Sequence, residues 1–181
     1  MRKINEIFYS LQGEGFHTGV PAVFIRFSGC NLHCSFCDTR HENGEWLTDE
    51  QIIEKVNAYP AQTVILTGGE PSLWIDEKLV DLLHEEGKYV CIETNGTRKL
   101  PSGIDWVTCS PKEGTEIVLE RIDELKVVYI GQNLSKYAQM KATHHFLQPC
   151  SCQNTKEVVA YILKNPLWRL SLQTHKLIDI Q

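Results

Sequence analysis

The chain has 181 residues, 42% of them hydrophobic, which is enough for one well-buried core but few for two, so we expect a single domain over residues 1–181. A formal net charge of −5 and the lack of a Lys/Arg cluster argue against a nucleic-acid-binding protein, which is usually strongly basic. The N-terminal residues contain no apolar block long enough for a signal peptide or membrane span, and we expect the seven cysteines to be free thiols in a reducing cytoplasm.

Short apolar runs recur along the chain and predict buried strands, because several consecutive residues in each are apolar. They cover residues 22–27, 63–67, 89–94, 105–109, 124–130, 144–148 and 168–173. Amphipathic helices lie between several of them. The first begins at a capping box of Thr48 and Gln51 and ends at Pro60, and the second covers about 75–86 and stops at Gly87. The third begins at Asn154 and closes before Pro166.

Strands that alternate with helices predict an α/β fold with right-handed crossovers and a parallel sheet. Six or seven strands in a chain of this length indicate a partial, open (β/α) barrel. Only about ten residues join the strands at 89–94 and 105–109, too few for a full crossover helix. We therefore expect the ring of helices to be incomplete.

Three cysteines with the spacing C-x3-C-x2-C, namely Cys30, Cys34 and Cys37, follow the first of these runs. Three thiolates hold three corners of a [4Fe–4S] cluster and leave the fourth iron open, whereas clusters that only carry electrons take four cysteines. A zinc site with His33 or His41 as the fourth ligand is the alternative. No second ligand pair follows at a suitable distance, which weakens the zinc interpretation.

Polar motifs follow six of the predicted strands, at the edge of a parallel sheet where active sites gather. They are the cysteine loop, TGGEP (67–71), ETNGT (93–97), SPK (110–112), QPCS (148–151) and QTHK (173–176). The two glycines of TGGEP allow the backbone to approach a ligand closely, although a tight turn alone also explains such a pair. Of the other cysteines, Cys91 and Cys109 lie in apolar runs and are predicted to be core residues, while Cys150 and Cys152 form a C-x-C pair of undetermined role.

The cysteine loop resembles that of the radical S-adenosylmethionine (SAM) enzymes in its spacing, its strand context and the aromatic Phe36 inside the second gap. In that family the amino and carboxylate groups of the cofactor fill the open iron. Four more motifs narrow the resemblance: YSLQGEG (9–15), CDT (37–39), ETNGT and SLQTHK (171–176). Together they resemble the 7-carboxy-7-deazaguanine synthase family over nearly the whole chain.

The resemblance implies roles for residues at matching positions. The cofactor is lined by Phe36, Cys37, Asp38, Gly69, Ser110, Pro111, Lys112, Gln148, Pro149, Cys150 and Ser151, with Glu70 beside Gly69 at the methionine ammonium. The substrate is contacted by Leu11, Gln12, Gly13, Arg26, Thr67 and Gln181. Thr39 is a ligand of Mg²⁺. A structural salt bridge is the alternative for Arg26, and a structural role is expected for His175.

The implied reaction is the ring contraction of 6-carboxy-5,6,7,8-tetrahydropterin to 7-carboxy-7-deazaguanine with loss of ammonia, in the queuosine and 7-deazapurine pathway. It implies a carbon–nitrogen lyase that uses a [4Fe–4S] cluster, SAM and Mg²⁺. It also implies a one-electron donor of the flavodoxin or ferredoxin type, a homodimer, and neither nucleic acid nor membrane as partner. Two alternatives are an activase for a glycyl-radical enzyme and a zinc-stabilised binding module.

Overall fold

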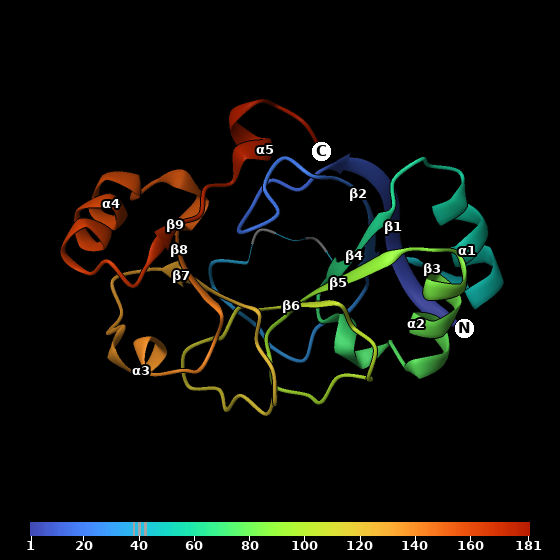
Figure 1. Cartoon of the computed structure of the whole chain (residues 1–181), viewed down its shortest axis with the longest axis horizontal. Coiled ribbons are helices and arrows are strands. Elements are labelled where there is room, and N and C mark those ends of the chain that lie inside the picture. Colours follow the sequence, from blue (N-terminus) through green and yellow to red (C-terminus); the bar gives the residue numbers. More distant parts are fainter. Residues whose placement is uncertain (38, 40, 42) are drawn as a thin grey trace.

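The structure is a computed structural model that describes residues 1–37, 39, 41 and 43–181. In these residues the strands form one sheet in the order β3-β1-β2-β4-β5-β6-β7-β8-β9 (Figure 1). The strands are β1 (Arg2–Leu11), β2 (Pro21–Phe27), β3 (Glu45–Leu47), β4 (Thr63–Gly68), β5 (Tyr89–Thr94), β6 (Trp106–Cys109), β7 (Glu124–Tyr129), β8 (His144–Pro149) and β9 (Arg169–Leu170). From β2 to β9 all neighbours are parallel, and the sheet is curved and open, which confirms the predicted partial barrel.

Two strands differ from the predicted all-parallel arrangement. β1 pairs with β2 in the antiparallel direction, and the short β3 pairs with β1 in the same way. No strand was expected at either place. At the other end of the sheet, β9 is only two residues long, although a strand was predicted over 168–173. The residues after it leave the sheet, because Thr174 binds the loop that follows β1, through its main-chain N–H and its hydroxyl.

The longer helices agree with the predictions and cover the convex face of the sheet. They are α1 (Asp49–Asn57), α2 (Glu77–Glu85) and α4 (Thr155–Lys164). The capping box of Thr48 and Gln51 is present, and Gly87 follows α2 with φ +69°. The remaining helical pieces are short: α3 (Ser135–Ala138), α5 (Thr174–Leu177) and 3₁₀ turns at Pro71–Leu73 and Cys150–Cys152. No described helix joins β5 to β6 or β6 to β7, so the helix ring is incomplete as expected.

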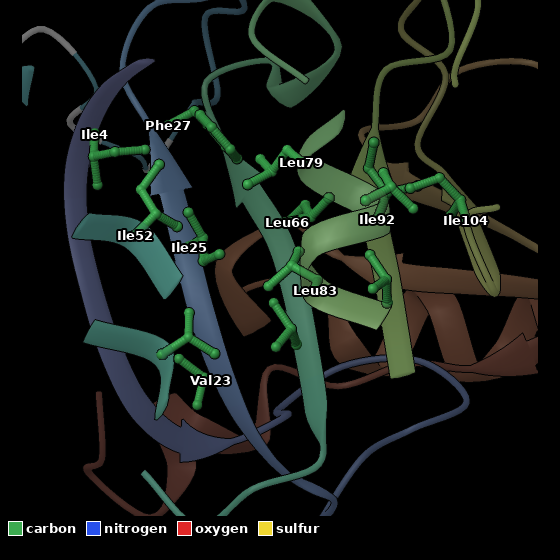
Figure 2. Close-up of a cluster of buried hydrophobic side chains, with 14 of the residues drawn as sticks. Ile4, Val23, Ile25, Phe27, Ile52, Leu66, Leu79, Leu83, Ile92 and Ile104 are labelled. Atoms are coloured by element: carbon green, nitrogen blue, oxygen red, sulfur yellow. The ribbon is translucent and has the colours of Figure 1, made fainter. Parts of the chain in front are cut away.

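Side chains alternate between the two faces of each strand and so divide the core from the site. On β2, Val23, Ile25 and Phe27 point outward and pack under α1 and α2, where they meet Ile52 and Leu79 (Figure 2). The other labelled members of this cluster in Figure 2 are Ile4, Leu66, Leu83, Ile92 and Ile104. The intervening residues point to the concave face. Because both faces are largely buried, the strands appear as nearly continuous apolar runs in the sequence.

The concave face is apolar at the amino ends of the strands and polar toward their carboxyl ends. The apolar part contains Phe8, Ala22, Phe24, Ile65 and Cys91, with Trp106 beside them. Further along the same strands, the inward positions are polar or charged, and these residues form the wall of the site described next. No helix in the described part of the chain is long and apolar enough to cross a lipid bilayer.

Candidate active site

A pocket of about 580 Å³ opens on the concave face and reaches the carboxyl ends of the strands. Its volume is within the usual range for a small-molecule site. Most of the residues singled out from the sequence line it: Leu11, Gln12, Gly13, Arg26, Cys30, Cys34, Phe36, Cys37, Thr39, Thr67, Gly69, Ser110, Lys112, Gln148, Pro149, Cys150, Ser151 and Gln181. Asp38 lies outside the described residues. Pro111 is buried and lines a separate small cavity together with Tyr137 and Met140.

The cysteine loop presents three free thiols to one end of this pocket. Cys30 lies three residues after the end of β2, and a turn in which the Cys37 N–H donates to the Cys34 carbonyl (3.1 Å) brings the other two to the same wall. The described residues contain no group of three His, Cys, Asp or Glu side chains around one ion position. A cubane cluster does not require such a group, because each thiolate binds a different iron. The donor set of three thiols therefore fits a [4Fe–4S] cluster with one open iron.

The TGGEP turn packs directly against the start of the cysteine loop. A Cβ atom built on Gly69 would overlap the carbonyl oxygen of Gly29, which also accepts from the Glu70 N–H (2.9 Å). Only glycine allows this approach of two backbones. The Glu70 side chain is fully buried and does not line the pocket. Its carboxylate accepts from the N–H groups of Ser72 (3.1 Å) and Asn95 (2.7 Å) and from the Thr94 hydroxyl (2.7 Å), so it ties two strand-end turns together.

The third turn of this end of the pocket is SPK. Lys112 Nζ donates to the carbonyl and the hydroxyl of Ser110, at 2.8 and 2.7 Å. The same Nζ lies 6.0 Å from the centroid of the Phe36 ring, which links SPK to the cysteine loop. Burial lowers the pKa of the Lys112 ammonium. Pro111, between the two pocket residues, lines the separate small cavity instead.

The QPCS segment is held in an unusual backbone conformation. Ser151 and the following Cys152 have φ values of +46° and +61°, which residues other than glycine rarely adopt. Asn154 stabilises this turn by accepting from the Cys150 N–H (2.9 Å) and donating to the Tyr129 carbonyl (2.9 Å). Asn154 still precedes α4, but its side chain makes no capping hydrogen bond, because the turn uses it. Cys150 and Ser151 thereby face the pocket.

A buried network of charges lies in the same pocket and was not anticipated from the sequence. Lys126 Nζ contacts Glu14 Oε2 at 2.5 Å and Glu93 Oε1 at 3.1 Å. Glu93 also accepts from Gln12 Nε2 (3.2 Å) and from the Thr67 hydroxyl (2.9 Å). Both groups of the Gln12 amide are engaged, because its oxygen accepts from the Glu14 N–H (3.1 Å).

The electrostatics of this network follow from burial and pairing. Burial alone would raise the pKa of Glu93, but the charge of Lys126 and the hydrogen bonds it receives outweigh that effect and lower it. In the same way, burial opposes the charge of Lys126, yet the carboxylates of Glu14, Glu93 and Glu124 raise its pKa. The pocket therefore holds Lys126 as an ammonium and Glu93 as a carboxylate. One sequence signal was present, since Lys126 is a charged residue between the apolar Leu125 and Val127 of β7.

The C-terminal QTHK segment docks on the QGEG loop. The Gly13 carbonyl accepts from both the N–H and the hydroxyl of Thr174, each at 2.9 Å. Gln173 Nε2 donates to Glu14 Oε1 (2.8 Å), and a Cβ on Gly13 would overlap the ring of His175. These contacts place His175 over the QGEG loop, where it lines the pocket. In Figure 1 the C-terminal segment, drawn in red, accordingly crosses the top of the molecule toward β1 and β2.

Arg26 and Gln181 meet at the rim of the pocket through one carboxylate. Arg26 Nε donates to Glu6 Oε1 (2.7 Å), and Gln181 Nε2 donates to Glu6 Oε2 (2.9 Å). The salt bridge that the sequence left open as an alternative for Arg26 is therefore present. It does not exclude ligand binding, because Arg26 itself lines the pocket and its side chain is 23% exposed.

Comparison with known proteins agrees with this geometry. Residues 24–135 match the model of the radical SAM superfamily. The chain is 70% identical to the 7-carboxy-7-deazaguanine synthase of Bacteroides thetaiotaomicron, with all of both chains covered. It is 40% identical to that of Nitratidesulfovibrio vulgaris, over 98% of each chain.

A solved structure gives the same result for the fold. The crystal structure of QueE from Escherichia coli superimposes with a TM-score of 0.80 at 31% identity, and it covers 94% of this chain and 93% of that one. The chain therefore belongs to the 7-carboxy-7-deazaguanine synthase family of the radical SAM superfamily.

Proposed function

We propose that this chain is a radical SAM lyase that converts 6-carboxy-5,6,7,8-tetrahydropterin into 7-carboxy-7-deazaguanine, with loss of ammonia, in 7-deazapurine biosynthesis. The observation that carries the proposal is one pocket with two chemically different ends. Three cysteine thiols line one end, and polar side chains suited to a heterocyclic acid line the other. Membership of the family, at 70% identity over the full length, supports the same assignment.

The cluster end contains the residues that would hold the cofactors. Cys30, Cys34 and Cys37 would ligate a [4Fe–4S] cluster, and the open iron would bind SAM. When bound, the cluster and SAM would together supply radical chemistry for hydrogen abstraction at C6 of the substrate, with one electron from the external donor. The chain's part is to hold the reactants together and exclude water.

Three turns around that end supply contacts of the kind SAM requires. The backbone at Gly69 offers polar groups close to the cluster, and Phe36 offers an apolar face for adenine. Ser110 and Lys112 present a hydroxyl and an ammonium to the same wall. Gln148, Pro149, Cys150 and Ser151 also line the pocket. Asp38 keeps a proposed role here on the strength of family resemblance alone, while Pro111 is not a direct contact in this proposal.

The substrate end offers complementary groups to a carboxypterin. The guanidinium of Arg26 suits the substrate carboxylate, since it donates in a planar fork. The network around Glu93 presents hydrogen-bond donors and acceptors to the pterin ring, with Leu11 and Gly13 beside it. Because Gln12 is already bound to Glu93 and Glu14, we propose that it acts within this network and does not contact the ring as an independent group.

A magnesium ion bound by Thr39 is part of the proposal. Thr39 lines the pocket beside Cys37, whose thiol lies 3.7 Å from the Thr39 carbonyl oxygen. A hydroxyl, water molecules and a substrate carboxylate are ligands that Mg²⁺ accepts. The ion would fix that carboxylate while the ring rearranges.

An external electron donor and an assembly state complete the proposal. The electron for the cluster comes from an external one-electron donor, for which a flavodoxin or ferredoxin is the proposed type. The functional unit is proposed to be a homodimer of chains, with residues 1–181 acting as one domain. These statements rest on family resemblance.

The decisive test is anaerobic incubation of the reconstituted protein with SAM, Mg²⁺, a chemical reductant and the carboxytetrahydropterin. We expect 7-carboxy-7-deazaguanine and ammonia in equal amounts. Replacing any one of Cys30, Cys34 and Cys37 by Ala should abolish both the cluster absorbance and the product. Cys109→Ala is the matched control, because burial raises the pKa of that thiol to about 12 and it lies in the core, so iron content should be unchanged. An intact cluster without product would refute the assignment.

A further inference from the structure

A β-bulge at the start of β1 places a carboxylate opposite Arg26. Ile4 pairs with Phe27, and the next pairing joins Glu6 to Arg26, so that Asn5 is an extra residue on β1. A bulge of this kind reverses the alternation of side chains along the strand. Ile4 therefore points into the outer core and is 1% exposed, whereas Glu6, two residues later, lies on the pocket face.

The contacts of Glu6 join two residues that come from opposite ends of the chain. One carboxylate oxygen accepts from Arg26 Nε (2.7 Å), and the other accepts from Gln181 Nε2 (2.9 Å). The main-chain oxygen of Gln181 in turn accepts from the hydroxyl of Ser10 (2.7 Å), which lies two residues after Phe8 on β1. Glu6 is thus the link between the guanidinium and the segment that lies over the rim.

The manner in which Glu6 binds the guanidinium leaves most of its donors available. The bond uses Nε alone, and the Phe8 ring lies 5.6 Å from the Arg26 Cζ atom, so one face of the plane is covered. Among the residues the structure describes, no hydrogen-bond partner occupies the two Nη atoms of Arg26. A carboxylate on Nε and a ring beneath the plane restrict the rotamer while both Nη groups remain free to donate.

We propose that Glu6 is a positioning residue that holds Arg26 ready for the substrate carboxylate and couples its binding to docking of Gln181. The inference rests on the proposed function, in which Arg26 receives that carboxylate. Glu6 does not touch the substrate. A carboxylate beside Arg26 could compete with the substrate carboxylate for the guanidinium. Glu6 instead fixes the guanidinium in place and keeps the C-terminal segment at the rim. Replacing a positioning residue should raise KM, whereas replacing a competing carboxylate should lower it.

The experiment compares wild type with Glu6→Ala and Glu6→Gln in steady-state turnover of the carboxytetrahydropterin. For Glu6→Ala we expect KM to rise about tenfold, equivalent to about 1.4 kcal/mol, with kcat within about threefold of wild type. Glu6→Gln keeps an acceptor for Nε but loses the charge, so its KM should lie between the two. Glu45→Ala, which removes an exposed carboxylate on β3, is the control and should leave KM unchanged.

The coupling to Gln181 requires a second pair of variants. Deleting Gln181 should raise KM in the wild type, and the same deletion in Glu6→Ala should add little, because the contact is already lost. A fluorescence titration of each protein with 6-carboxypterin gives the affinity without turnover. Iron content and reductive cleavage of SAM in the absence of substrate should match wild type in every variant, which separates positioning from misfolding.

The outcomes distinguish this inference from the proposed function. Wild-type protein with a full cluster but no product would refute the proposed function. The role of Glu6 is overturned if Glu6→Ala binds 6-carboxypterin as tightly as wild type, or more tightly, as a competing carboxylate would predict. Additive effects of Glu6→Ala and the deletion of Gln181 would overturn the coupling.

Discussion

Lys126 on β7 and Glu14 in the loop after β1 are 112 residues apart in the chain, yet the ammonium and carboxylate lie 2.5 Å from each other. Glu93 lies 3.1 Å from the same ammonium. The three side chains together fix the QGEG loop to the middle of the sheet. All three side chains are less than one-quarter exposed. A buried pair loses more when one partner is removed than it contributes to stability as a whole, because the remaining charge is left without compensation.

Lys126→Met should therefore destabilise the protein strongly. It leaves the carboxylates of Glu14 and Glu93 close together without their cation, and we expect the free energy of unfolding to fall by about 3–5 kcal/mol. Urea denaturation of the metal-free protein at pH 7 measures this. Lys55→Met is the matched control, because Lys55 pairs with Glu45 at 3.8 Å on the surface and should cost less than about 1 kcal/mol. Equal losses in the two variants would contradict the interpretation.

Glu124 makes a prediction about pH. Its carboxylate accepts from the Phe16 N–H (3.0 Å) and is only 2% exposed, and burial raises its pKa above the ordinary value. A raised pKa means that the folded state binds the Glu124 proton more tightly than the unfolded state does. Proton binding at Glu124 therefore contributes fully to stability below the unfolded-state pKa of about 4.3. This contribution is lost as pH rises through the folded-state pKa.

Glu124→Gln removes this titration and keeps an acceptor for Phe16. We expect the variant to gain stability relative to wild type as pH rises above about 4.3, by at most about 1.4 kcal/mol per pH unit until the folded pKa is passed. Chemical denaturation of both proteins across pH 4–8 gives the difference. A difference that stays constant over this range would show that Glu124 does not titrate as its burial requires.

Much of the fold follows from local patterns in the sequence. The strand at 89–94 and the capping box at Thr48 are found where they were predicted, since each depends on neighbouring residues. β1 was missed for a physical reason. The bulge at Asn5 shifts the alternation midway, so Ile4 and Phe8, both even-numbered, face opposite sides of the sheet. Neither a regular alternation nor a continuous apolar run is left in the sequence to indicate a strand.

The candidate site likewise has a part that could be predicted from neighbouring residues and a part that could not. Motifs made of consecutive residues, such as the cysteine loop and TGGEP, identify the cluster end of the pocket. The buried network was not found, because a charge in a strand is informative only with its partner, and Lys126 meets Glu14 through the order of the strands. Glu70 illustrates a related limit: a carboxylate in a glycine-rich strand-end motif appears functional in the sequence, but here it is fully buried and joins two turns.

Thr39→Val tests the proposed magnesium site. Valine keeps the shape of threonine and removes the hydroxyl, so the ion would lose its protein ligand. We expect the Mg²⁺ concentration for half-maximal product formation to rise about tenfold, while iron content stays at the wild-type level. Thr143→Val, at an exposed position before β8, should respond to Mg²⁺ as wild type does. Unchanged stimulation by Mg²⁺ in Thr39→Val would assign the ion to other ligands.

Gly69→Ala tests the close approach between the TGGEP turn and the cysteine loop. The added methyl group would overlap the Gly29 carbonyl, and this carbonyl is fixed by its bond to the Glu70 N–H. Since both partners are backbone, one of the two turns must move, and overpacking of this kind costs about 1–3 kcal/mol. Cys30 directly follows Gly29, so the displacement should also reduce iron content and weaken SAM binding, as measured by iron analysis and equilibrium dialysis.

Gly131→Ala is the control: its φ of +89° makes alanine unfavourable there too, but no atom lies within 4 Å of the new methyl group. That variant should lose about 1 kcal/mol of stability and keep a full cluster. If both variants retain full iron content and SAM affinity, the contact between the turns has no role in holding the cofactors, and glycine at position 69 is required only for the turn.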